Sequence, residues 1–228
     1  MTRTRRSRFA TIAVPLIVAI AACGGEDADA PDSGDAQEDA DVVAERCVVR
    51  LHGKGGQGAP ATVDAGGIAI LSPDGNGTGW GGRQWEYDTD AGVDAATAEI
   101  TAAVDQAACE RVVVHGFSNG ASMAAALLCD GDDLDGRLAG VVIDDPVTDA
   151  ATEGCAPAAV PVTVYWTGAL DATAPPGTRC DSIDWTCDGG VVRGIEAFTT
   201  DIGVDTTASP FDDHRWYVDT PLPIMWLE

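Results

Sequence analysis

Short apolar runs alternate with helical patterns along the chain from residue 47 onward. Runs rich in β-branched residues predict buried strands at 47–51, 67–72, 112–114, 140–145 and 161–166. Apolar residues recur at helical spacing from Val93 to Ala108, and good helix formers extend from Ala121 to Leu128. Strands that alternate with helices predict a three-layer α/β fold, in which helices cover both faces of a mostly parallel sheet.

The strand predicted at 112–114 leads directly into Gly116-Phe117-Ser118-Asn119-Gly120, a Gly-x-Ser-x-Gly motif between a strand and a helix. This arrangement is typical of a nucleophile elbow, a strained turn that presents a serine at the end of a sheet. Glycines on both sides lack the Cβ atoms that would collide where strand and helix meet. We therefore expect Ser118 to be a catalytic nucleophile. The alternative is a serine in an ordinary strand-to-helix turn.

The first predicted strand ends in His52-Gly53-Lys54-Gly55-Gly56. A loop of this kind offers a backbone N–H to the oxyanion of a tetrahedral intermediate. We assign this role to the N–H of Lys54, with the N–H of Asn119 as the second donor. A phosphate-binding loop is the alternative, but the Gly-Lys-Ser/Thr ending and a following helical pattern are both missing.

The general base must be one of three histidines. His52 belongs to the glycine loop and His115 lies at the end of the predicted strand, just before the elbow, which leaves His214. The competing interpretation of His214 is an exposed loop histidine beside two aspartates.

The acid that orients this base is expected at Asp171, which follows the strand predicted at 161–166. Asp144 and Asp145, at the end of the preceding strand, are the weaker candidates. The chain order Ser118, Asp171, His214 resembles the order of the catalytic triad in α/β-hydrolases.

A glycine-rich loop over 73–85 carries two tryptophans that we expect to be exposed and to line a cleft, unless they simply pack. The candidate substrate contacts are Trp80, Trp85, Trp185 and Trp216. The loop begins like a calcium-binding loop, but Trp85 occupies the twelfth position, where a glutamate is required. Catalysis by a serine, a histidine and an aspartate needs no metal and no organic cofactor, so none is expected.

The first 22 residues have the layout of a secretory signal, with four arginines before an apolar run over 9–22 that is too short to span a bilayer. The run ends in Ile20-Ala21-Ala22-Cys23, which resembles the lipobox of bacterial lipoproteins, in which the cysteine carries lipid. The sequence thus predicts an exported protein with a lipid anchor on Cys23. A plain signal peptide cut nearby is the alternative.

Residues 23–45 are acidic and lack aromatic residues, which predicts a disordered tether between the anchor and a domain over 46–228. The whole chain has 13 Lys+Arg against 37 Asp+Glu and a net charge of −24. Such a charge repels nucleic acid and anionic lipid headgroups. We expect no nucleic-acid partner, and membrane contact through the lipid anchor only.

Several segments resemble the secreted polyhydroxybutyrate-depolymerase and feruloyl-esterase-like branch of the α/β-hydrolases. They are Gly116–Met123, Leu127-Leu128-Cys129, Cys155-Ala156-Pro157 ahead of Pro161-Val162, and Gly168-x-x-Asp171-x-x-x-Pro175. The resemblance covers about residues 47–217 and implies the α/β-hydrolase fold. The domain is short for that fold and has no obvious lid insertion, so we expect a minimal version without a lid. The chain departs from the family at Asp213-His214-Arg215-Trp216-Tyr217, where Gly-Gly-His-x-Trp-Pro is usual. We also expect the first one or two antiparallel strands of the fold to be missing.

Six cysteines remain if Cys23 is lipidated, and an even number in an exported domain predicts three disulfides. The expected pairs are Cys47–Cys109, Cys129–Cys155 and Cys180–Cys187. The second pair is implied by the family resemblance. The first joins residues that precede neighbouring strands of this fold, and the third joins residues that are close in sequence.

Together these features predict an extracytoplasmic serine esterase, a monomer that hydrolyses carboxylic esters through an acyl-enzyme. An open site without a lid suits bulky substrates, polymeric or aromatic. Two alternatives remain. One is an acyltransferase or peptidase that uses the same triad, and the other is a non-catalytic surface binding protein on a hydrolase scaffold.

Overall fold

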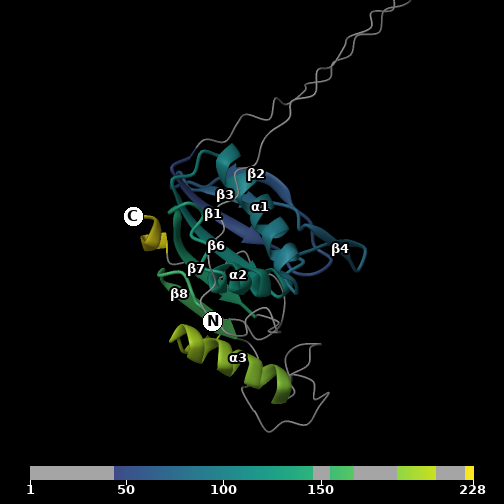
Figure 1. Cartoon of the computed structure of the whole chain (residues 1–228). Helices are drawn as coiled ribbons and strands as arrows, with labels where there is room; N and C mark the ends of the chain where they lie inside the picture. The colour runs from purple at the N-terminus through teal and green to yellow at the C-terminus, as the bar shows by residue number, and fades with distance from the viewer. Residues whose placement is uncertain (1–43, 146–154, 167–188, 209–223) are drawn as a thin grey trace, which may run out of the picture. The chain divides into compact units, whose positions relative to one another are not determined.

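The structure is a computed structural model that describes residues 44–145, 155–166, 189–208 and 224–228 (Figure 1). These residues belong to one compact unit, Asp39–Glu228. No helix within these ranges combines the length and apolar character needed to cross a bilayer. Several predicted features fall outside the described residues: Cys23, Asp171, Cys180, Trp185, Cys187, His214 and Trp216.

A seven-stranded sheet forms the centre of the described fold, in the order β2-β3-β1-β6-β7-β8-β9. Its strands are β1 (Arg46–Leu51), β2 (Ala59–Val63), β3 (Ala69–Ser72), β6 (Arg111–Phe117), β7 (Leu138–Asp144), β8 (Val162–Trp166) and β9 (Thr206–Ala208). Neighbouring strands are parallel except β2 and β3, which are antiparallel. The prediction of a mostly parallel α/β sheet is confirmed.

The described residues include three α-helices beside the sheet: α1 (Asp90–Gln106), α2 (Asn119–Cys129) and α3 (Gly189–Ile202). The side chain of Thr89 caps α1 by accepting a hydrogen bond from the N–H of Gly92 at 3.0 Å, which satisfies one donor of the first turn. Helix α1 then buries Ala96, Ile100 and Val104. In α2 every residue from Asn119 to Leu128 is buried, which explains why this segment is apolar on all sides.

Alternating residues of β6 build a core on each face of the sheet. Val112 and Val114 belong to the large cluster that includes side chains of α1, α2 and α3. Val113 points to the other face, into a smaller cluster closed by Leu227 of the 3₁₀ helix η2 (Ile224–Leu227). Among the described residues, η2 is the helix that covers this second face, whereas the sequence predicted helices over both faces.

Six elements of the described residues are missing from the sequence prediction: β2, β9, α3, η2 and the two strands of a small antiparallel hairpin, β4 (Gly77–Gly79) and β5 (Gly82–Gln84). Strand β2 is exposed along its whole length, so it carries no alternating apolar pattern. The hairpin lies in the glycine-rich segment that was expected to be a loop. No described strand precedes β1, and the antiparallel edge strand β2 follows β1 in the chain.

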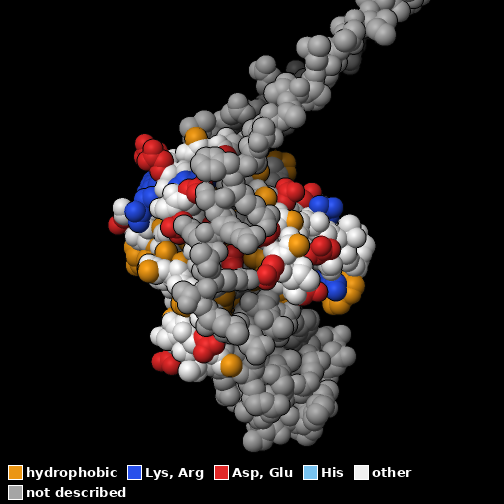
Figure 2. All heavy atoms as spheres, viewed as in Figure 1, with side chains coloured by type: hydrophobic (Ala, Val, Ile, Leu, Met, Phe, Trp, Pro, Cys, Tyr) orange, Lys and Arg blue, Asp and Glu red, His pale blue; other side chains and the backbone are white. Residues whose placement is uncertain are grey.

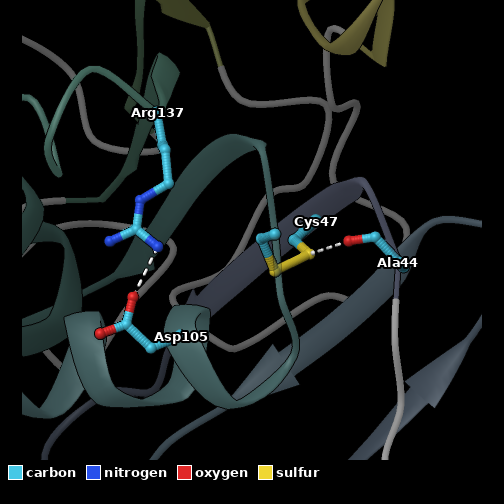
Figure 3. The surroundings of a disulfide bond; sticks show 5 residues. Ala44, Cys47, Asp105 and Arg137 are labelled. Atoms are coloured by element: carbon cyan, nitrogen blue, oxygen red, sulfur yellow. Dashed lines mark hydrogen bonds and ion pairs between the residues drawn. A yellow bond between two sulfur atoms is a disulfide. The ribbon is translucent and has the colours of Figure 1, made fainter.

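Two of the three expected disulfides join described residues, and both are present. Cys47–Cys109 ties the start of β1 to the segment before β6 (Figure 3). Cys129–Cys155 ties the last residue of α2 to the segment before β8. Figure 2 shows acidic side chains spread over the visible face of the described part, with lysine and arginine at few places.

Candidate active site

The carboxyl ends of four parallel strands share one edge of the sheet. Leu51 of β1 pairs in register with Gly116 of β6, and Phe117 of β6 pairs with Asp144 of β7. Asp144 in turn pairs with Tyr165 of β8. Ligands of parallel α/β sheets bind at this edge, because the loops that follow the strands converge there.

Ser118 occupies a strained turn at this edge, between β6 and α2. Its φ of 54° and ψ of −116° are rare for a residue with a side chain, and such backbone strain costs about 1–3 kcal/mol. A Cβ on Gly116 would collide with the carbonyl oxygen of Gly120, and a Cβ on Gly120 would collide with that of Leu51. The turn therefore requires both glycines, as the sequence motif predicts. The backbone N–H of Ser118 donates to the carbonyl oxygen of Asp144 at 2.9 Å.

Helix α2 begins immediately after this serine, and the backbone donors of its first turn have no intrahelical acceptor. The N–H of Ser122 donates to the carbonyl oxygen of Ser118 at 3.0 Å, which closes the first turn of the helix. The N–H of Asn119 lies in the first turn, where helix geometry provides no intrahelical acceptor. The Ser118 side chain makes no capping bond to the helix, and the first turn contains no acidic residue. This helix end therefore favours a developing negative charge.

The glycine loop after β1 passes directly beside the serine. A Cβ built on Gly53 would lie 3.4 Å from the Cβ of Ser118 and 3.2 Å from the ring of Phe117. The structure thus brings the His52–Lys54 loop and Ser118 together at one place. Residues with larger side chains at position 53 would crowd Ser118.

Both ring nitrogens of His52 contact the backbone around this loop. Its Nδ1 lies 2.8 Å from the carbonyl oxygen of Gly53, and the N–H of Gly75 donates to its Nε2 at 3.2 Å. A neutral imidazole protonated on Nδ1 satisfies both contacts, because a carbonyl only accepts and an N–H only donates. Both ring nitrogens are therefore used by the backbone, which supports excluding His52 as the general base.

The β4–β5 hairpin is attached to the same loop. The N–H of Gly55 donates to the carbonyl oxygen of Arg83 at 2.8 Å. The N–H of Arg83 donates to the carbonyl oxygen of Gly56 at 2.7 Å. At the hairpin tip Trp80 has a φ of 50° and is 77% exposed. The Nζ of Lys54 lies 5.3 Å from the centre of the Trp80 ring, within the range of a cation–π contact.

Trp85 differs from Trp80, and the expectation that it is exposed is wrong. It is only 1% exposed, and its ring lies beside that of His52, with 5.6 Å between the ring centres. Its backbone N–H donates to Oδ1 of Asn119 at 2.7 Å, while Nδ2 of Asn119 donates to its carbonyl oxygen at 3.1 Å. Sequence reasoning assigned a role only to the backbone of Asn119. No periodic signal points to a side-chain bond across 34 residues.

His115 lies behind the turn, buried in β6. Its Nε2 is 3.4 Å from Oδ2 of Asp144, whose carboxylate is also buried. Burial lowers the pKa of His115 and outweighs the opposing effect of Asp144. The imidazole is therefore neutral near pH 7, and its 1% exposure agrees with leaving it out as the base. Asp144 is held between this histidine and the backbone of Ser118.

The structure gathers Ser118, Asn119 and the His52–Lys54 loop at one edge, as predicted. Asp171 and His214 lie outside the described residues, so their roles stay predictions. Trp166, the last residue of β8, ends at the same edge five positions before Asp171. Among the described residues, no group of three or more His, Cys, Asp or Glu side chains could hold a metal ion.

Solved structures share this arrangement of strands and helices. A carboxylesterase of Bacillus cereus superimposes with a TM-score of 0.51 at 20% sequence identity, over 76% of this chain and 82% of that one. A carboxylesterase of Mesorhizobium loti gives 0.50 at 18% identity, over 79% and 86%. The structure of YahD with malic acid gives 0.52 at 14% identity, over 76% and 87%.

The chain therefore has the α/β-hydrolase fold, with a strained strand-to-helix turn at Ser118. No family model matches the chain, and a search of curated proteins finds no match.

Proposed function

We propose that this protein is a serine hydrolase that cleaves carboxylic esters through an acyl-enzyme. One observation carries the proposal: Ser118 sits in a strained turn at the start of α2, with the Gly53 backbone against it. Backbone strain persists where the surrounding structure enforces it, and it is concentrated at active sites. Here the nucleophile, the helix N-terminus and the glycine loop meet at one point.

In the proposed reaction, the Oγ of Ser118 attacks the ester carbonyl carbon while His214 accepts the hydroxyl proton. Asp171 orients the imidazole and stabilises its charged form. The N–H groups of Lys54 and Asn119 bind the oxyanion, and losing one such donor costs on the order of 10²–10³ in rate. His214 then returns the proton to the leaving alcohol. A water molecule, activated by the same histidine, releases the acid and restores the serine.

Ester hydrolysis is favoured over the other reactions of such a triad by two of the structural neighbours, which are carboxylesterases. The resemblance of segments 116–123 and 168–175 to polyhydroxybutyrate depolymerases and feruloyl esterases extends the proposal to polymeric or aromatic esters. Trp80 offers an exposed ring beside the glycine loop for such a substrate. An acyltransferase or peptidase would instead require an alcohol acceptor or a peptide.

The proposal places this enzyme outside the cytoplasm. The disulfides Cys47–Cys109 and Cys129–Cys155 suit an oxidising compartment. The signal-like N-terminus and the lipobox at Cys23 support export with a lipid anchor. Mass spectrometry of the membrane fraction tests the anchor, because a Cys23→Ala variant would lose both the acyl mass and the membrane association.

Fluorophosphonate labelling together with hydrolysis of short p-nitrophenyl esters tests the activity. We expect wild type to be labelled and active, and Ser118→Ala to lose both properties. Ser122→Ala is the matched control, because Ser122 is a buried serine one turn further along the same helix. An unlabelled wild type, or equal labelling of Ser118→Ala, rejects the enzyme in favour of a binding protein. Turnover only with an added alcohol acceptor or peptide favours the rival reactions.

A further inference from the structure

Next to the proposed nucleophile, the side chain of a buried asparagine forms hydrogen bonds with both backbone polar groups of a residue that is distant in sequence. Oδ1 of Asn119 accepts from the N–H of Trp85, and Nδ2 donates to the carbonyl oxygen of the same residue. We propose that Asn119 is a positioning residue whose side chain sets the geometry of the oxyanion hole. This inference rests on the proposed esterase function and adds a second role to a residue otherwise used only through its backbone.

The side chain of Asn119 is specific for this contact. Its amide offers one acceptor and two donors on a short stem, so it can satisfy an N–H and a carbonyl of one residue at the same time. Asn119 is 9% exposed, and a buried polar group that loses its partner costs about 1–3 kcal/mol. The two bonds therefore fix the side-chain torsions and, through them, the first residue of α2.

The contact also connects the two halves of the oxyanion hole. The ring of Trp85 lies against His52, and His52 holds the carbonyl oxygen of Gly53. Gly53 in turn lies against Ser118, the residue before Asn119. A closed circuit thus runs from the helix start through Trp85 to the glycine loop and back to the nucleophile.

The circuit matters because oxyanion donors work only at a narrow distance. Each N–H must lie about 2.7–3.1 Å from the place where the oxyanion forms. A misplacement of about 1 Å can cost a hundredfold in rate. A side chain that never touches the substrate can therefore control kcat by holding the Asn119 N–H and the glycine loop in register.

The chain offers a matched control in Asn76. Its Oδ1 accepts from the N–H of Glu86 at 2.8 Å, and its Nδ2 donates to the carbonyl oxygen of Gly92 at 3.0 Å. It uses the same chemistry on the residue next to Trp85, but it connects that segment to α1 and not to the nucleophile. Loss of Asn76 should weaken the fold without moving the oxyanion donors.

The test compares Asn119→Ala and Asn76→Ala for folded fraction, kcat, KM and the affinity of a trifluoromethyl ketone that forms a tetrahedral adduct. Asn119→Ala should lose about 10- to 100-fold in kcat per folded molecule, with KM nearly unchanged and ketone affinity falling in parallel. Asn76→Ala should lose stability alone. Equal kcat values for the two variants overturn the proposal.

Asn119→Asp covers the case in which the alanine variant does not fold. The carboxylate has the same shape and still accepts from the Trp85 N–H, but it has no donor for the carbonyl oxygen of Trp85. We expect kcat to fall here too, and a wild-type kcat rejects the inference. The esterase proposal fails separately, if Ser118→Ala keeps activity. An active, Ser118-dependent enzyme that tolerates both Asn119 variants rejects only the positioning role.

Discussion

The two ends of strand β6 differ in backbone strain and in the interactions that stabilise them. At the carboxyl end, the chain passes through a positive φ at Ser118 and collects buried polar groups of His115, Asn119 and Asp144. The amino end lies about 20 Å away along a strand of this length, and it is stabilised by a disulfide and an ion pair. There the disulfide Cys47–Cys109 lies near the Arg137–Asp105 ion pair (Figure 3).

This difference shows that the strained backbone and the disulfide lie at opposite ends of the same strand. The strained turn is unfavourable by itself. It is possible because Gly116 and Gly120 have no Cβ atoms to collide with the backbone, and it is stabilised by hydrogen bonds such as that from the N–H of Ser118 to the carbonyl oxygen of Asp144. The covalent reinforcement lies where it cannot restrict the proposed site. Substitutions at the amino end should therefore lower stability and leave the activity of the folded protein unchanged, whereas substitutions at the carboxyl end should disturb the turn itself.

The largest expected effect comes from Gly120→Ala at the carboxyl end. The new methyl group would collide with the carbonyl oxygens of Leu51 and His52, which are backbone atoms that cannot move aside. We expect a loss of about 4 kcal/mol or more in the free energy of unfolding, measured by urea denaturation. Gly67→Ala is the control, because it has a φ of 75° but open space around its Cβ position. It should cost only about 1 kcal/mol, and equal losses would contradict the role of the collision.

Removal of the amino-end disulfide should follow. Replacing Cys47 and Cys109 together by serine opens a link across 62 residues. The loop-entropy relation predicts a loss of about 4 kcal/mol in the free energy of unfolding. The ester-hydrolysis rate per folded molecule should stay at the wild-type value. A rate that falls at temperatures where the variant remains folded would contradict the separation of the two ends.

A smaller effect concerns the pH dependence of stability. Burial lowers the pKa of His115 in the folded state, so below about pH 6.5 the unfolded chain binds a proton that the folded chain does not. The free energy of unfolding should therefore fall as the pH decreases through this range. The groups that act on this imidazole are Asp144 and Arg50. His115→Gln keeps a donor toward Asp144 without titrating, so its urea midpoint should fall less between pH 7 and pH 5. Parallel curves for the two proteins would exclude His115 as the source.

The smallest effect is expected at the Arg137–Asp105 pair. The two groups lie 2.6 Å apart, but the Asp105 side chain is 62% exposed, so water and salt screen the attraction. Asp105→Ala should cost about 0.2–1 kcal/mol, and less in 1 M salt. Urea denaturation at low and high salt measures both values. A loss above 2 kcal/mol would show that this pair, like the disulfide, is a main support of the amino end.

The buried centre of the fold could be predicted from the sequence, whereas its edges could not. The central strands β1, β6 and β7 carry continuous apolar runs because both faces are covered, and α2 follows a motif with a fixed meaning. Strand β2 is exposed, and β4–β5 consists largely of glycine and polar residues. Their pairing depends on partners such as the Gly56–Arg83 bridge, which no local pattern records.

The proposed site shows the same division. Ser118 and its two glycines form a contiguous motif, so local sequence is enough to predict the turn. The bond between Asn119 and Trp85 joins residues 34 positions apart and uses one side chain against a backbone. Any residue at position 85 other than proline would offer the same N–H and carbonyl, so the sequence there carries no trace of the contact. The burial of Trp85 follows from this tertiary context.

Lys54, on the glycine loop beside Ser118, is the only lysine of the chain. Its amine is exposed and lies over the ring of Trp80. Amine-reactive dyes will therefore attach a single side-chain label on the loop beside the proposed site, next to an indole that can quench it. Lys54 can therefore carry a fluorescent reporter of this site without an engineered cysteine, so the disulfides are not disturbed.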